Sequence, residues 1–331
     1  MDCQRMLIDS FGRVVTDLRI SVTSRCNFSC IYCHNEGLGH PPLLPDRKNG
    51  DMGPDEIGRY VRIARELGIG SVKLTGGEPL VRSDLEEIVD RCIQHVSDVS
   101  LTTNGSALAG RADALRLAGL KRVNVSLDSL DPDAFRDIRH GSLQPVLTGV
   151  RAALDAGLKP VKLNLVVMKQ TMEYIPAMID YVGGTKGLKL QLIQFMPELV
   201  HHEEWSADMA ELKEWLEKRA DSVITREMHH RRIYHLNGAE VEVVDPVRNP
   251  EFCANCHRIR LTHDARLKGC LNRNDNLVQL RGLDDVGVRE AFRRVATERV
   301  PYYGVFVRDS ERETILGRRH SSKVSERYLR P

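Results

Sequence analysis

Six short apolar strand patterns alternate with amphipathic helix patterns over the first two thirds of the sequence. The predicted strands cover residues 18–23, 71–75, 98–103, 122–128, 159–168 and 188–196. Between them, apolar residues recur at helical spacing, as they do over residues 54–68. Strands that alternate with helices of this length form parallel βαβ units, because each crossover needs a helix-sized connection. The sequence therefore predicts an α/β fold, a barrel or partial barrel of six βα units.

Polarity alternates along these predicted strands. Successive side chains of a strand face opposite sides of the sheet, and the apolar side must meet the helices. The inward side then carries Arg19, Ser21, Thr23, Lys73, Thr75, Asn124, Ser126, Lys162 and Asn164. A closed eight-stranded barrel fills its interior with branched apolar side chains, so this pattern predicts an open, wet interior that binds something polar and anionic. A buried salt-bridged core is the alternative, but few acidic residues share the inward positions.

Three cysteines, Cys26, Cys30 and Cys33, follow the first predicted strand with the spacing C-x3-C-x2-C. This position is at the carboxyl ends of the strands, where barrels keep their chemistry. An iron–sulfur cluster usually takes four cysteines, so a cluster held by three would leave one iron open for a small molecule. Three ordinary thiols, or half of a zinc site, are the alternatives.

The segment CNFSCIYC, residues 26–33, resembles the cluster-binding signature of the radical S-adenosylmethionine (SAM) enzymes. The segment TGGEP, residues 75–79, lies one strand–helix unit later and resembles the segment that binds the SAM amino group in that superfamily. The resemblance implies a partial TIM-type (β/α)6 barrel and a [4Fe–4S] cluster whose open iron is chelated by SAM. It also implies that Tyr32 lies against the adenine and that reductive cleavage of SAM gives a 5′-deoxyadenosyl radical.

A second set of cysteines, Cys253, Cys256 and Cys270, lies in a C-terminal region with a different pattern, a helix over 207–220 followed by short strands. By spacing alone, the set is either a zinc site with His257 or His263 as fourth ligand or a second three-cysteine cluster. We expect residues 1–203 to form the partial barrel, and residues 204–331 to form a small cluster-binding layer that closes its open side.

The tract over residues 252–270 resembles the GTP 3′,8-cyclases of molybdenum cofactor biosynthesis, archaeal-type members included, and the resemblance extends over residues 11–283. It implies a second [4Fe–4S] cluster that binds the guanine. The implied cluster ligands are Cys26, Cys30 and Cys33 for the first cluster and Cys253, Cys256 and Cys270 for the second. The implied SAM contacts are Tyr32, Gly77, Ser126 and Met196. The implied GTP contacts are Arg19, Lys73, Thr102, Lys162, Arg258 and Arg260, of which the last two are also implied to be catalytic.

The resemblance also implies the reaction, a lyase-type conversion of GTP to (8S)-3′,8-cyclo-7,8-dihydroguanosine 5′-triphosphate in the first step of molybdopterin synthesis. A reductant protein and the next enzyme of that pathway are the implied partners. Three departures from the family leave room for a radical SAM enzyme that acts on another nucleotide or on a peptide. Lys73 and Gln191 stand where arginine is common, and the sequence ends in SERYLRP where bacterial members end in two glycines.

Charge and hydropathy indicate which partners and which cellular location the sequence favours. The 48 Lys and Arg residues nearly balance the 46 Asp and Glu residues, which gives no support for a nucleic-acid partner. The basic stretch from Arg289 onward is interpreted as solvated surface. Neither a run of about 18 apolar residues nor a secretory signal is visible, so we expect a cytoplasmic protein without a membrane partner, either monomer or homodimer.

The remaining cysteines and histidines are given structural interpretations. Cysteines in such a chain are expected to bind metal and not to form disulfides. Cys92 lies on a helix pattern and is predicted to be a small buried apolar residue. The histidine pairs at 201–202 and 229–230 stand in polar surroundings and are predicted to lie on the surface.

Overall fold

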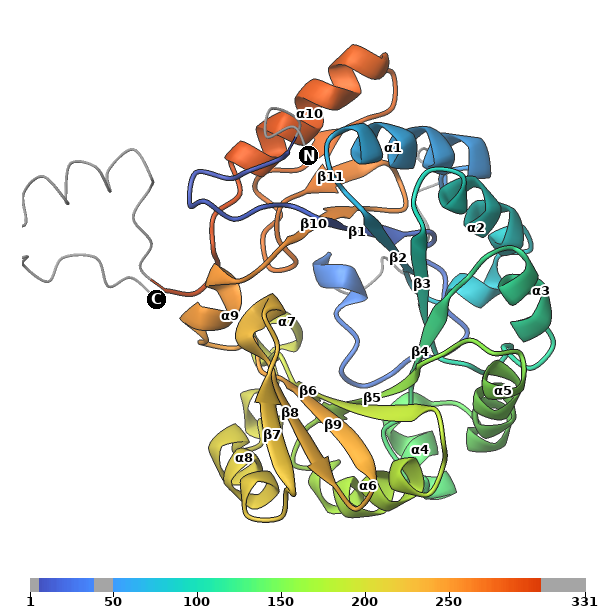
Figure 1. The fold of residues 1–331 in the computed structure, drawn as a ribbon, viewed down its shortest axis with the longest axis vertical. Helices are drawn as coiled ribbons and strands as arrows, with labels where there is room; N and C mark the ends of the chain where they lie inside the picture. The colour runs from blue at the N-terminus through green and yellow to red at the C-terminus, as the bar shows by residue number, and fades with distance from the viewer. Residues whose placement is uncertain (1–5, 39–49, 305–331) are drawn as a thin grey trace, which may run out of the picture.

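The computed structural model describes residues 6–38 and 50–304 of the chain. Six parallel strands, side by side in sequence order, form the central part of a twelve-stranded sheet. They are β1 (Asp17–Ser21), β2 (Ser71–Thr75), β3 (Asp98–Thr103), β4 (Arg122–Ser126), β5 (Val161–Val167) and β6 (Leu188–Gln194). The sheet curves strongly, and within the described chain its two end strands do not pair with each other (Figure 1). The predicted fold class, a partial and open α/β barrel, is confirmed.

Helices connect these strands and cover the outer side of the curved sheet (Figure 1). They are α1 (Pro54–Glu66), α2 (Leu85–Ile93), α3 (Ala112–Leu117), α4 (Pro132–Arg139), α5 (Leu143–Asp155) and α6 (Ile175–Gly183). Local sequence sets some of their starts. The Asp131 carboxylate accepts hydrogen bonds from the backbone N–H groups of Asp133 and Ala134, and Pro132 occupies the first turn, where its missing N–H costs nothing.

The C-terminal region lengthens the same sheet at both edges. Its strands are β7 (Ser222–Thr225), β8 (Arg232–Leu236), β9 (Ala239–Val244), β10 (Arg258–Leu261), β11 (Arg266–Lys268) and β12 (Val278–Gln279). β9 pairs in parallel with β6, and β10 pairs in parallel with β1. The second cysteine set is therefore carried beside β1, and not on a sheet of its own.

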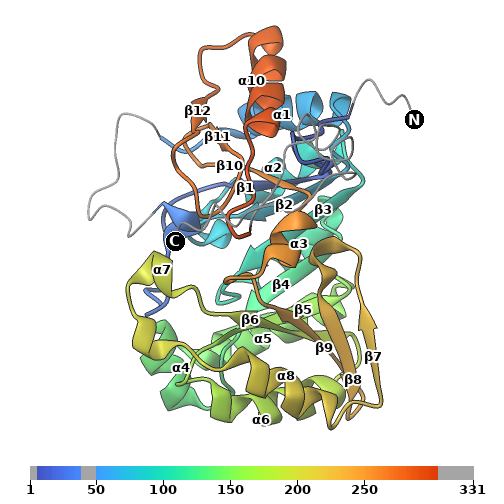
Figure 2. The ribbon, with the colours of Figure 1, turned by 90° about the vertical axis from the view of Figure 1, so that its left-hand side faces the viewer.

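Short helices complete the C-terminal region. They are α7 (Pro197–Val200), α8 (Met209–Glu217), α9 (Pro250–Ala254) and α10 (Asp285–Thr297). Figure 2 shows α10 beside α1, and residue contacts between the two helices agree with that view. No helix in the described part of the chain is both long and apolar enough to cross a membrane. Of the basic stretch that begins at Arg289, residues 289–304 are described, and the remainder, with the SERYLRP ending, lies outside the described residues.

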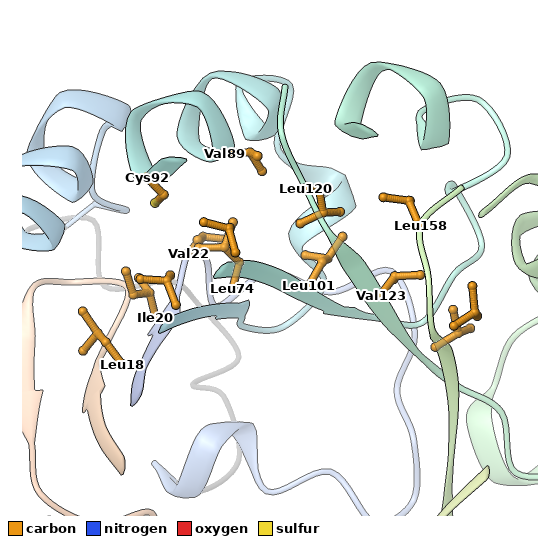
Figure 3. Packing of buried hydrophobic residues seen from close by; sticks show 14 of the residues in the cluster. Leu18, Ile20, Val22, Leu74, Val89, Cys92, Leu101, Leu120, Val123 and Leu158 are labelled. Carbon is orange, nitrogen blue, oxygen red and sulfur yellow. The ribbon is translucent and has the colours of Figure 1, made fainter. Parts of the chain in front are cut away.

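Strand polarity is as predicted on the helix-facing side. Leu18, Ile20 and Leu74 are fully buried between the sheet and the helices, where Figure 3 shows them. Cys92 is packed in the same cluster, which confirms its prediction as a small core residue. The packing of this apolar side fixes the strand register, because a slip of one residue would turn the apolar side chains inward.

The opposite face of the sheet carries more acidic side chains than we predicted. Glu36 comes from the loop after Cys33 and Glu242 from β9, both outside the six predicted strands, and Asp17 begins β1. The ion pairs are Asp17–Arg258, Glu36–Arg260 and Glu242–Lys162, with nitrogen–oxygen distances of 3.6, 2.5 and 2.7 Å. The expectation that inward cations have few acidic partners is therefore wrong, because segments outside the strand pattern supply the acids.

Candidate active site

A cavity lies on the inner side of the curved sheet and is bounded by both the barrel strands and the C-terminal region. Nine of the residues predicted for the site line it: Arg19, Tyr32, Thr102, Met196, Arg258, Arg260, Cys253, Cys256 and Cys270. The fold thus brings residues that are up to 250 positions apart in sequence into one chamber, with the second cysteine set and the predicted R-x-R pair in its wall.

The first cysteine loop follows β1 directly. The Cys33 N–H donates to the Cys30 carbonyl at 3.0 Å, and the Phe28 N–H points to the Cys26 sulfur at 3.4 Å. Burial raises the pKa of the Cys30 thiol to about 12, and the neighbouring Cys33 and Cys26 add to the shift. The three cysteines therefore stand in one short loop directly after β1, as their assignment to one cluster requires.

The glycines at 76–77 allow the first cysteine loop and the end of β2 to touch. The Gly77 N–H donates to the Thr23 carbonyl at 2.8 Å, and the Glu78 N–H donates to the Arg25 carbonyl at 2.8 Å. A Cβ atom on Gly77 would lie 2.2 Å from the Arg25 carbonyl oxygen, which no real side chain tolerates. This close backbone approach explains why the two motifs predicted from sequence occur together.

Glu78 fastens the end of β3 to the same region. Its buried carboxylate accepts hydrogen bonds from the Thr103 hydroxyl and the Asn104 N–H, each at 2.5 Å. The Asn104 side chain in turn donates to the Asn27 side chain, inside the cysteine loop, at 2.8 Å. Burial raises the pKa of Glu78, while these hydrogen bonds oppose the shift. One acidic residue therefore holds three loops in register around the cysteines.

Tyr32 is fixed by two residues that the sequence analysis did not single out. Its hydroxyl donates to the Asp128 carboxylate at 2.7 Å and also contacts the Arg139 guanidinium. Asp128 is fully buried and accepts a further hydrogen bond from the Val166 N–H at 2.8 Å. Burial raises the pKa of Tyr32 well above its usual value, so the ring stays neutral. The only sequence signal for Asp128 is its place just after β4.

The second cysteine set gathers from two separate segments. Cys253 lies in α9, Cys256 follows it, and Cys270 comes after β11. Burial raises the pKa of Cys253, and Cys270 and Cys256 lie near enough to contribute. Each of the three thiols is partly buried and lines the cavity. The arrangement suits a cluster that is held at the wall with one side open to the chamber.

The histidines considered as zinc ligands are engaged elsewhere. His257 Nδ1 lies 2.8 Å from the Val14 carbonyl oxygen, and His263 Nδ1 lies 3.1 Å from the Asp51 carboxylate. In the described part of the chain, no group of three Cys, His, Asp or Glu side chains is drawn together as a site for a single metal ion. Neither histidine ring makes a hydrogen bond or an ion pair with the second cysteine set in the described structure.

Guanidinium groups dominate the wall beside this set. The strand register places Arg19 between Arg260 and Lys73. Burial lowers the pKa of Arg19 to about 9, and repulsion from Arg258 and Arg260 adds to the effect. The Arg19 Nε–H has no hydrogen-bond partner in the described chain. Positive charge is therefore concentrated in a partly dry chamber, where an anion would relieve the repulsion.

Four further residues were predicted to contact SAM or GTP but do not line the cavity in the described structure: Lys73, Gly77, Ser126 and Lys162. The Lys73 ammonium donates to the Asn124 side chain at 3.2 Å, and the Lys162 ammonium donates to Glu242 at 2.7 Å. Ser126 ends β4, and Gly77 follows β2. Gln191, which stands where arginine is common in the resembled family, does line the cavity and donates to Glu242 at 2.7 Å.

His229 corrects one prediction. It is only 2% exposed, not on the surface, and its ring stacks on Phe252 with centroids 4.0 Å apart. Its two ring nitrogens have no hydrogen-bond partner among the described residues, and the residue lines the cavity together with Arg231 and Arg258. Burial and the neighbouring cations strongly lower its pKa, so the ring is neutral. The sequence neighbours of His229 are polar, so the sequence does not indicate that this residue is buried. His201 and His230, in contrast, are exposed as predicted.

Comparison with known proteins agrees with the family resemblance that the sequence motifs indicate. Residues 20–182 match the radical SAM superfamily, and residues 188–303 match the family described as Molybdenum Cofactor Synthesis C. The chain is 49% identical to a "Probable GTP 3′,8-cyclase" of Halobacterium salinarum (strain ATCC 29341 / DSM 671 / R1), over 91% of either protein. A protein of that name from Methanocella arvoryzae is 46% identical over 90% of this chain and 95% of its own length.

Solved structures show the same fold at low sequence identity. Streptococcus suis SuiB bound to its precursor peptide SuiA is similar with a TM-score of 0.61 and 16% identity, over 84% of this chain and 66% of that chain. Methylornithine synthase (PylB) is similar with a TM-score of 0.53 and 15% identity, over 92% of this chain and 87% of that chain. From its sequence relatives and from its two domain matches together, the chain belongs to the radical SAM superfamily and, within it, to the GTP 3′,8-cyclase family.

Proposed function

We propose that this protein is a GTP 3′,8-cyclase, which converts GTP to (8S)-3′,8-cyclo-7,8-dihydroguanosine 5′-triphosphate in molybdenum cofactor biosynthesis. The relatives at 49% and 46% identity carry the name of that enzyme. The observation that carries the proposal is the cavity itself, in whose wall three cysteines stand beside buried guanidinium groups. Such groups suit phosphate oxygens and purine acceptor atoms alike.

The cofactors follow from the family: SAM with one [4Fe–4S] cluster, and a second [4Fe–4S] cluster in the C-terminal domain. We assign the first cluster to Cys26, Cys30 and Cys33, and the second cluster to Cys253, Cys256 and Cys270. With SAM bound, the reduced first cluster would supply one electron that cleaves SAM into methionine and a 5′-deoxyadenosyl radical, and this radical would take a hydrogen atom from the ribose C3′ of GTP.

The residues around Tyr32 would position SAM. Asp128 and Arg139 hold the Tyr32 hydroxyl, which fixes the position of the ring in the cavity wall. Met196 lines the same cavity, and we assign it, with Gly77 and Ser126 near the strand ends, to SAM binding. The close contact between Gly77 and the first cysteine loop would keep the SAM amino group near the open iron of the first cluster.

The cationic wall would hold GTP. We assign Arg258 and Arg260 to the base end, beside the second cysteine set, and Arg19, Lys73, Lys162 and Thr102 to the rest of the nucleotide. Clamping both ends would bring ribose C3′ and guanine C8 close enough to react and would exclude water from the radical. In this assignment residues 1–203 bind SAM and residues 204–331 supply the second cluster and its side of the cavity.

Reaction of the reconstituted protein tests the proposal. We expect the anaerobically reconstituted protein, given a reductant, SAM and GTP, to form 5′-deoxyadenosine and a cyclised GTP product, both detected by mass. The two products should rise together with GTP concentration. If 5′-deoxyadenosine forms while GTP is untouched, the substrate assignment is wrong, and other nucleotides and then peptides become the candidates. We also infer a cytoplasmic location, a reductant protein and the next enzyme of the pathway as partners.

Replacing Arg19 by methionine is expected to weaken GTP binding without lowering the stability of the fold. The side chain keeps its apolar stem but loses a charge that lies between other cations, so we expect the melting temperature to stay level or rise. GTP affinity should fall about 10- to 100-fold, the usual value of a hydrogen bond between charged groups. Calorimetric titration with GTP and with SAM checks this. A matched loss of SAM affinity would contradict the assignment of Arg19 to GTP.

A further inference from the structure

Arg231 is a buried cation in the cavity wall that the sequence analysis did not single out. It lies between the short turn Met228–His230 and β8, and it is 5% exposed. It lines the same cavity as Gln191 and Arg258. We propose that Arg231 binds the phosphate groups of the nucleotide substrate, as a substrate-contacting residue supplied by the C-terminal region. The proposal rests on the proposed function and names one cation of its phosphate subsite.

The hydrogen bonds of Arg231 are incomplete. A guanidinium carries five N–H donors. Those of Arg231 find the Glu242 carboxylate at 3.2 Å, the Met228 carbonyl at 3.5 Å and the Met228 sulfur at 3.8 Å. All three are long, and sulfur is a weak acceptor. A buried guanidinium with such poor partners is costly unless a ligand with strong acceptors completes its hydrogen bonds.

Glu242 does not neutralise this part of the wall. Its side chain is 3% exposed and faces three cations, Lys162 at 2.7 Å, Arg226 at 2.9 Å and Arg231 at 3.2 Å. One carboxylate against three cations leaves two positive charges without a partner in this group. The two closer cations occupy the carboxylate more directly. Of the three, Arg231 alone is among the described residues that line the cavity, so it adds to the wall a cation that can meet an anion directly.

The surroundings of Arg231 increase the positive potential. Arg258 contacts the same Met228 sulfur at 3.8 Å, so both guanidinium groups meet at one thioether. Strand β6, which β9 separates from β8, contributes Gln191, which has no charge. Burial, with repulsion from Arg258 and Arg226, lowers the pKa of Arg231 to about 10, against the pull of Glu242. A phosphate group held at Arg231 would offset this repulsion and accept paired hydrogen bonds from its guanidinium.

The backbone before Arg231 is held in an unusual conformation. His229 and His230 have φ angles of 62° and 47°, in the left-handed region that side chains other than glycine rarely adopt. The His229 N–H donates to the Asn255 carbonyl at 3.1 Å, and His230 pairs with Glu251 at 2.6 Å. Both partners belong to the segment that carries Cys253 and Cys256. The position of Arg231 is therefore tied to the second cysteine set.

Equilibrium binding to the reconstituted protein, without reductant or SAM, tests the proposal. The probes are GTP, guanosine and inorganic tripolyphosphate. We expect Arg231→Ala to weaken GTP and tripolyphosphate binding 10- to 100-fold, and guanosine binding less than threefold. Arg226→Ala is the matched control, because Arg226 contacts the same carboxylate, is 39% exposed and does not line the cavity. It should change GTP affinity less than threefold.

A second variant distinguishes the loss of a phosphate contact from a folding defect. In the Arg231→Ala background, Gln191→Arg returns a cation to the same wall and should recover most of the lost tripolyphosphate and GTP affinity. Unchanged GTP and tripolyphosphate affinity in Arg231→Ala would overturn the proposal, as would an equal loss of guanosine affinity without rescue. If tripolyphosphate binding depends on Arg231 but GTP is not cyclised, the phosphate site stands while the proposed function falls.

Discussion

Replacing Cys30 by alanine is expected to abolish formation of 5′-deoxyadenosine, whereas replacing Cys256 by alanine is expected to abolish only the cyclised product. Cys30 belongs to the set that we assign to SAM, and a cluster with two protein ligands does not keep its open iron in place. Each variant should lower the rate of cyclisation by at least about 1,000-fold, since no other group among the residues that the structure describes can replace the missing chemistry. Each should also lose about half of the bound iron.

The two variants are expected to lose different products, and this difference distinguishes the roles of the two proposed clusters. Cys256→Ala keeps the first cysteine set and the Tyr32 contacts, so SAM cleavage should continue without product. Cys92→Ala is the matched control, because this thiol is fully buried in the core between the sheet and the helices. It should keep its full iron content and activity. Iron loss that is equal in Cys30→Ala and Cys92→Ala would mean that the first set is not a cluster site.

Strand polarity made much of the site predictable. Arg19 and Lys73 were assigned to the inner face by alternation alone, and the structure places them there beside Arg260. Alternation works here because the helix-facing side must be apolar to be buried, and that requirement fixes the direction of every other side chain. The two cysteine motifs, which we assign to the clusters, were visible in the sequence by their close spacing alone.

Contacts between distant segments were not predictable in this way. Glu242 and Arg231 come from the C-terminal region, and no local pattern states that β9 will pair with β6. His229 stands among polar residues and is buried only because an unusual turn directs its ring onto Phe252. Such features depend on tertiary packing, which overrides what neighbouring residues suggest. His229 and Arg231, two of the buried cavity-wall residues that the sequence analysis missed, lie together in this one segment.

Contacts between segments far apart in the sequence also connect Asp9 to the second cysteine set. Its fully buried carboxylate contacts two buried guanidinium groups, Arg13 at 2.6 Å and Arg299 at 3.0 Å. Arg13 donates to the Cys253 carbonyl at 2.8 Å, and Arg299 donates to the Cys256 carbonyl at 2.6 Å. Residues from both ends of the described chain thus hold the backbone of two of the proposed cluster ligands.

Asp9→Ala should therefore lower both stability and iron content. Removing the carboxylate leaves two buried cations unpaired, which costs about 3–5 kcal/mol of the free energy of unfolding. The loop around Cys253 and Cys256 loses its anchors, so we expect iron to fall toward one cluster per chain while SAM cleavage persists. Asp55→Ala is the control, because its pair with Arg91 is largely exposed and should contribute less than about 1 kcal/mol. Denaturant unfolding and iron analysis measure the two effects. A destabilised Asp9→Ala protein with full iron would show that the cysteine loop stands without this network.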